Sequence, residues 1–140
     1  MGDSRHMANI DDYDAIFVRL ETFCHATEDE NKVMNAMQLL LPEGVDIVKK
    51  RVEGYHKNPI IIFSAEARGR KIAKSWFDDI IRKLDERGLE TVARKIEAMD
   101  RSNTIYLRFD KQKACLGRLT LLDADDVLHV KVRLVKKHRP

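Results

Sequence analysis

The hydrophobic and polar positions of this chain divide it into short strands and amphipathic helices. Apolar residues that alternate with polar ones, or form short apolar runs, predict strands over residues 15–24, 45–52, 60–67, 104–109, 117–122 and 127–135. Apolar residues three and four positions apart predict helices over residues 27–41, 70–87 and 89–99.

Local signals set the ends of these elements. Thr27 and Glu30 have the spacing of a capping box, so the first helix is expected to begin at Thr27. Gly88 is a typical stop signal for the helix over residues 70–87. The acidic segment 123–126 has the composition of a hairpin turn between the last two strands.

The resulting order, β-α-β-β-α-α-β-β-β, predicts a single α+β domain with a largely antiparallel sheet and helices packed on one face. Residues 1–6 have the character of a cloning leader, residues 7–136 form the domain, and residues 137–140 form a basic tail.

The composition predicts a cytoplasmic protein. No apolar run approaches the roughly 18 residues that a membrane-spanning helix needs, and no signal peptide is recognisable. Cys24 and Cys115 are far apart and not in a C-x-x-C pair, which is typical of a reducing compartment, and each is expected to be a small buried residue.

The charge is unevenly distributed along the chain. Residues 1–30 contain eight acids and two arginines, whereas the rest of the chain has 15 acids and 24 lysines and arginines. This asymmetry indicates a basic face for an acidic partner. The alternative is an ordinary charged surface with a basic tail.

The strands over residues 104–109 and 127–135 each have a polar side. The first presents Tyr106 and Arg108, and the second presents His129, Lys131 and Arg133. If the two strands are neighbours, cations that bind phosphates lie beside an aromatic ring on which a base can stack. The alternative is the solvated face of an ordinary antiparallel sheet.

Cations also occupy the expected start of the helix over residues 70–87. Arg68, Arg70 and Lys71 lie where the helix dipole favours acids, and a bound phosphate would relieve this conflict. The alternative is surface charge that solvent screens.

Asp110 is expected to cap a short helical turn that follows the strand over residues 104–109. Lys111, Gln112 and Lys113 would then project into solvent, where Gln112 can bond a base or ribose. The alternative is a capped surface turn without a ligand.

The sequence contains no recognisable catalytic constellation. The neighbouring acids at 78–79 and 125–126 diverge in a helix or strand, so they lack the shared face that metal-dependent phosphodiester cleavage needs. The histidines lack metal-ligand spacing, and Cys24 beside His25 is a poor candidate for a catalytic thiol. We therefore expect no catalytic residue, metal or cofactor.

Four segments, residues 25–32, 54–68, 106–117 and 125–134, together resemble a known family. It comprises small archaeal proteins described as RNA-binding and as predicted exosome subunits, with a fold similar to that of the large-subunit ribosomal protein that binds 5S RNA. The resemblance implies RNA as a partner, together with exosome or other RNA-processing proteins.

The leading hypothesis is a non-catalytic RNA-binding protein that serves as an accessory in archaeal RNA processing or exosome-linked decay. Its expected phosphate contacts are Arg68, Arg70, Lys71, Arg108, Lys111, Lys113, Lys131 and Arg133. Its expected base or ribose contacts are Tyr106, Gln112 and His129.

Several alternatives stay open at this point. A protein-interaction subunit would dock on an RNA-processing complex through the acidic residues 11–30 without touching RNA. An enzyme such as a nuclease is the third hypothesis. DNA is also compatible with a basic face, and a homo-oligomer is compatible with the sequence.

Overall fold

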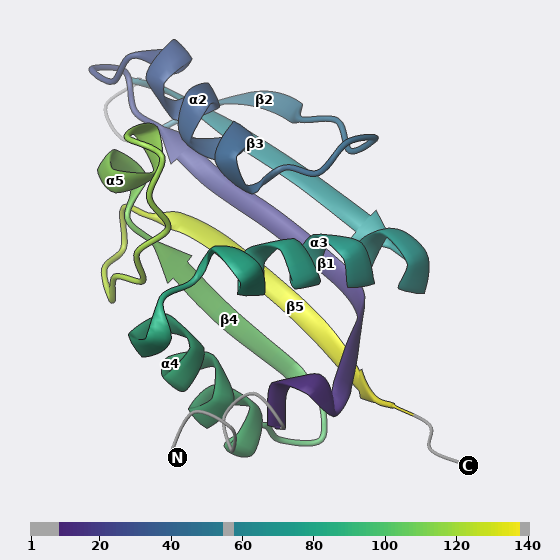
Figure 1. Ribbon diagram of the computed structural model, residues 1–140. Coiled ribbons are helices and arrows are strands. Elements are labelled where there is room, and N and C mark those ends of the chain that lie inside the picture. Colours follow the sequence, from purple (N-terminus) through teal and green to yellow (C-terminus); the bar gives the residue numbers. More distant parts are fainter. Residues whose placement is uncertain (1–8, 55–57, 138–140) are drawn as a thin grey trace. The chain divides into compact units, whose positions relative to one another are not determined.

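The structure is a computed structural model that describes residues 9–54 and 58–137. Its strands form one five-stranded antiparallel sheet in the order β2-β3-β1-β5-β4 (Figure 1). The elements are β1 (Tyr13–Cys24), α2 (Glu30–Leu40), β2 (Val48–Glu53), β3 (Pro59–Arg68), α3 (Arg70–Lys83), α4 (Glu86–Glu97), β4 (Thr104–Phe109), α5 (Lys111–Cys115) and β5 (Leu128–Lys136). The predicted α+β class and antiparallel sheet are confirmed.

The described residues divide into two compact units. The first unit contains residues 9–18, 67–107 and 131–137, and the second contains residues 19–54, 58–66 and 108–130. The proposed leader at residues 1–6 and most of the basic tail lie outside the described residues.

Helices α3 and α4 supply much of the core of the first unit. The stripe of Trp76, Phe77 and Ile80 on α3 is buried, as its helical spacing predicts. The predicted helix over residues 70–87 is too long, however, because α3 ends at Lys83 and Asp85 caps α4 by accepting a bond from the Gly88 amide at 2.8 Å. Gly88 is therefore part of the first turn of α4, where the Asp85 cap and the acidic Glu86 favour a helix start over a helix stop.

The first helix of the second unit begins later than predicted. Asp29, not Thr27, is the N-cap of α2, and its carboxylate accepts a bond from the Asn31 amide at 2.9 Å.

Strand β2 also begins later than predicted. It pairs with β3 in the antiparallel sense, from Val48 opposite Ser64 to Glu53 opposite Pro59. The strand predicted over residues 45–52 therefore begins at Val48.

The predicted strand over residues 117–122 is wrong. Gly117 has a φ of 85° and follows α5, and only one bridge, between Phe109 and Leu121, links this segment to β4 within the described chain. The segment follows the outer edge of β4 through backbone bonds from Asp110 N to Thr120 O and from Leu122 N to Arg108 O, both 2.9 Å. Residues 123–126 therefore form a loop that leads into β5 rather than a hairpin turn.

The part of the chain that the structure describes includes no helix that is long and apolar enough to cross a membrane.

Candidate nucleic-acid interface

Strands β4 and β5 are neighbours in the sheet, as the candidate site requires. In the first unit, Tyr106 is 58% exposed and Arg133 is exposed, whereas Val132 and Leu134 are buried. The amide of Leu134 donates to the carbonyl of Asn103 at 2.8 Å. In an antiparallel pair this bond makes Leu134 the partner of Asn103, so three residues further along each strand Lys131 is the partner of Tyr106. Both of these side chains lie on the solvent side.

The cations on this side are available for an external anion. Among the described residues, neither Lys131 nor Arg133 has an ion-pair partner, and Lys131 is partly exposed. An aromatic ring and two uncompensated cations therefore share one open surface. We call Tyr106, Lys131 and Arg133 the open-face group.

Arg68 lies at the end of β3, with its guanidinium carbon 5.1 Å from the centre of the Phe17 ring. This cation–π contact holds a flat, positively charged group against the half-buried side of β1. Phe17 was not among the expected site residues. The alternation of β1, which puts Phe17 on the side opposite Val18, is the signal that could have identified it.

The start of α3 keeps the conflict that the sequence predicts. The helix has no acid in its first turn and no side-chain cap, and Arg70 and Lys71 are exposed. Farther along the helix the cations are compensated, since Lys74 pairs with Asp78 at 3.2 Å. This pairing, through a hydrogen bond first and charge second, raises the pKa of Lys74 above its usual value.

In the second unit, the expected RNA contacts Arg108 and His129 are bonded to oxygen atoms of the loop 123–126. Arg108 pairs with the Asp123 carboxylate at 2.9 Å and approaches the Ala124 carbonyl at 3.5 Å. The His129 Nε2 atom lies 3.2 Å from the Asp125 carbonyl, and the His129 ring meets the edge of Phe23 at a centroid distance of 6.3 Å. Both candidate side chains thus already have intramolecular partners.

The predicted cap of α5 by Asp110 is confirmed, but the prediction that Lys111 projects into solvent is wrong. The Asp110 carboxylate accepts bonds from the amides of Gln112 and Lys113 at 2.9 and 3.1 Å, and both of these side chains are exposed. Lys111, in contrast, is only 7% exposed and does not project into solvent. Its ammonium group is bound inside the second unit by Phe23, Glu28 and Asp126, so it cannot reach a phosphate in this arrangement.

The Lys111 ammonium joins three segments of the second unit. It donates to the Phe23 carbonyl at 2.7 Å and lies 2.6 Å from the Asp126 carboxylate and 3.3 Å from both oxygens of Glu28. Glu28, which the sequence predicts to lie in the first turn of a helix that begins at Thr27, precedes α2 and pairs with Lys111 instead. Sequence reasoning missed this cluster because its members are far apart in the chain.

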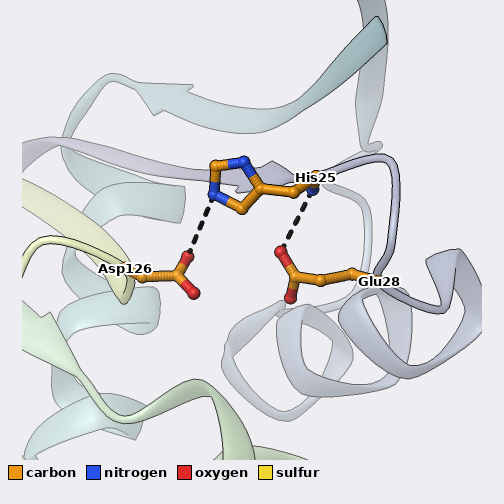
Figure 2. A group of neighbouring side chains, drawn as sticks. All are labelled: His25, Glu28 and Asp126. Atoms are coloured by element: carbon orange, nitrogen blue, oxygen red, sulfur yellow. Dashed lines mark hydrogen bonds and ion pairs between the residues drawn. The ribbon is translucent and has the colours of Figure 1, made fainter. Parts of the chain in front are cut away.

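His25 completes the cluster. Figure 2 shows the His25 amide directed at Glu28, at 3.1 Å, and its ring directed at Asp126, with 3.7 Å between His25 Nε2 and the carboxylate. Ligand atoms of His25, Glu28 and Asp126 lie within 4.8 Å of one another, as in a metal site. The Lys111 ammonium already binds two of the three, and its charge would repel a metal cation there.

A groove of about 750 Å³ lies beside this cluster, between α2 and α5. Its wall includes Cys115, which is exposed, so the expectation that both cysteines are buried holds only for Cys24. Burial raises the pKa of the Cys24 thiol, and the neighbouring Glu28 carboxylate raises it further. A raised thiol pKa disfavours the thiolate that nucleophilic catalysis requires.

Two archaeal proteins are similar in sequence to this chain. An RNA-binding protein of Pyrococcus abyssi is 35% identical over 125 residues, which cover 84% of this chain and 80% of that protein. An uncharacterized protein of Methanocaldococcus jannaschii is 36% identical over 118 residues, covering 79% of this chain and 78% of the relative.

Solved structures have the same fold. A crystal structure of a protein from Archaeglobus fulgidus has a TM-score of 0.73 and 30% identity, covering 86% of this chain and 87% of that one. A second, from Sulfolobus solfataricus, has a TM-score of 0.72 and 29% identity, with coverage of 84% and 86%. The family model described as RNA binding matches residues 17–134, so this chain belongs to that RNA-binding family.

Proposed function

We propose that this protein binds RNA without catalysing a reaction, and that the open-face group makes the main contact. The observation that carries the proposal is the placement of Tyr106, Lys131 and Arg133 on the solvent side of neighbouring strands, with no ion-pair partner for either cation among the described residues. Cations that are not compensated internally can neutralise phosphates and release counterions. An exposed tyrosine offers a base a stacking surface that does not depend on sequence.

Cations at the junction of β3 and α3 support the proposal. Arg68, Arg70 and Lys71 are exposed and belong to the same unit as the open-face group. The RNA backbone is the anion that would compensate the start of α3. The name of the Pyrococcus abyssi relative, an RNA-binding protein, agrees with this interpretation.

The chemistry of the second unit supports a non-catalytic role. Its cluster of titratable groups is held by Lys111, so His25, Glu28 and Asp126 serve one internal ion-pair network. General acid–base chemistry needs titratable groups that converge on an open site. We further propose, from the resemblance of the sequence to the archaeal family, an accessory role in RNA processing or exosome-linked decay in the cytoplasm, where its free thiols would remain reduced.

The alternative is a docking subunit that uses the acidic residues 11–30 and does not contact RNA. Part of that acidic segment is already neutralised within the second unit. Glu28 pairs with Lys111 and Glu30 pairs with Lys49. This internal pairing reduces the charge left for a partner, so RNA binding is the stronger proposal.

Fluorescence anisotropy with labelled single-stranded RNA, duplex RNA and DNA tests the proposal. We expect RNA binding whose logarithm falls linearly with the logarithm of salt concentration, with a slope of about −0.7 for each phosphate neutralised on a single strand. A protein that uses Lys131, Arg133 and the cations at the start of α3 should have a slope of roughly −2 or steeper. Absence of binding to either RNA at low salt by the folded protein would leave the docking subunit as the better account.

A further inference from the structure

We propose that the loop 123–126 competes with RNA for Arg108 and His129, so that the protein carries its own phosphate mimic. The inference rests on the proposed function and adds a means by which the second unit is kept closed to RNA. The observation behind it is that oxygen atoms of this loop already bind Arg108 and His129.

The acceptors of the loop resemble those of an RNA backbone. The Asp123 carboxylate is 2.9 Å from Arg108 Nη1, the Ala124 carbonyl is 3.5 Å from the same nitrogen, and the Asp125 carbonyl is 3.2 Å from His129 Nε2. A carboxylate and a phosphate group both offer a guanidinium two negatively charged oxygen atoms. RNA therefore competes with the loop for Arg108 Nη1 and His129 Nε2.

The exposure of the loop makes that displacement feasible. The Asp123 side chain is 99% exposed, so water screens its pair with Arg108. No apolar contact has to be broken to move a carboxylate that lies fully in solvent. A weak and reversible internal contact is what a competitive gate requires.

The two ends of the loop are held more firmly than its middle. Leu122 N, directly before the loop, donates to Arg108 O at 2.9 Å, and Asp126, the last residue of the loop, is bound by Lys111 at 2.6 Å. Thr22 Oγ1, which is buried, donates to the Val127 carbonyl at 3.0 Å. Residues 123–125 can consequently move while Leu122, Asp126 and Val127 stay in place.

The experiment compares two variants of equal charge in the full chain. Asp123→Ala removes the carboxylate of the mimic, and Asp46→Ala removes an exposed aspartate of the same unit that has no ion-pair partner among the described residues. Binding of a labelled single-stranded oligoribonucleotide is measured by anisotropy. Because exposed ion pairs are weak, Asp123→Ala should tighten binding about two- to fivefold more than Asp46→Ala does.

A double-mutant cycle assigns the gain to Arg108. In an Arg108→Ala background the advantage of Asp123→Ala over Asp46→Ala should disappear, since the pair is already broken. Equal affinities for the Asp123 and Asp46 variants, with clear RNA binding by both and by the wild type, would overturn the competition while leaving the proposed function in place. If none of the three proteins bound RNA, the proposed function would fail and this inference with it.

Discussion

Alanine substitution of the whole open-face group, Tyr106, Lys131 and Arg133, is expected to raise the Kd for single-stranded RNA by about 100-fold at roughly 0.1 M salt. For each phosphate contact, the affinity rises by about 0.7 log units when the salt concentration falls tenfold, from roughly 1 M to 0.1 M. Loss of two contacts therefore lowers the affinity at roughly 0.1 M by about 25-fold. Loss of one stacked base costs about 1–3 kcal/mol, which adds a factor of about five or more. Anisotropy titrations over a salt series measure both parts.

The salt dependence separates the cations from the tyrosine. Lys131→Ala with Arg133→Ala should make the salt slope shallower by about 1.4, whereas Tyr106→Ala should weaken binding with little change in slope. The matched control is Lys95→Ala with Arg101→Ala, which removes the same charge from exposed positions of the same unit that have no ion-pair partner in the described structure. Equal losses for the two double variants would mean that net charge, not the open face, governs binding.

Lys111→Met is expected to lower the free energy of unfolding by about 2–3 kcal/mol. Methionine fills the space of the lysine stem but leaves the Phe23 carbonyl without its donor and the carboxylates of Glu28 and Asp126 without their cation. Breaking a fully buried ion pair costs roughly 3–5 kcal/mol. The expected loss is smaller because the Asp126 side chain is 59% exposed and can be solvated by water.

Urea denaturation measures this loss, with Lys113→Met as the matched control. Lys113 lies two residues away on the same helix, is exposed, and has no ion-pair partner among the described residues, so its substitution should change stability by less than about 0.5 kcal/mol. Adding Asp126→Asn to Lys111→Met should recover part of the loss, because it removes one of the unpaired charges. Equal stability of the Lys111 and Lys113 variants would contradict the structural role given to Lys111.

The parts of the fold that the sequence predicts best are those with a clear hydrophobic period. Alternation along β5 correctly assigns Val130, Val132 and Leu134 to the core and Arg133 to solvent. It also places Tyr106 correctly on β4. The local pattern alone therefore decides on which side of the sheet Tyr106 and Arg133 of the open-face group lie.

The errors arise where a distant partner overrides the local pattern. Lys111 follows a helix cap and would be a surface residue by local criteria, yet three acceptors from β1, the segment before α2 and the loop before β5 compensate its burial. Such a cluster requires knowledge of which segments meet in space. The predicted helix end at Arg87 is wrong for a different reason. A helix start signal at Asp85 and a glycine stop signal at Gly88 compete there within four residues.

The central claim, that RNA lies on the open face of β4 and β5, is tested most directly by ¹H–¹⁵N NMR of the full chain during titration with single-stranded RNA. The account predicts that the largest amide shifts occur at residues 104–107 and 131–135, with smaller shifts at Arg70 and Lys71. Shifts confined to α2, α5 or residues 11–30, with β4 and β5 unchanged at saturating RNA, would contradict it.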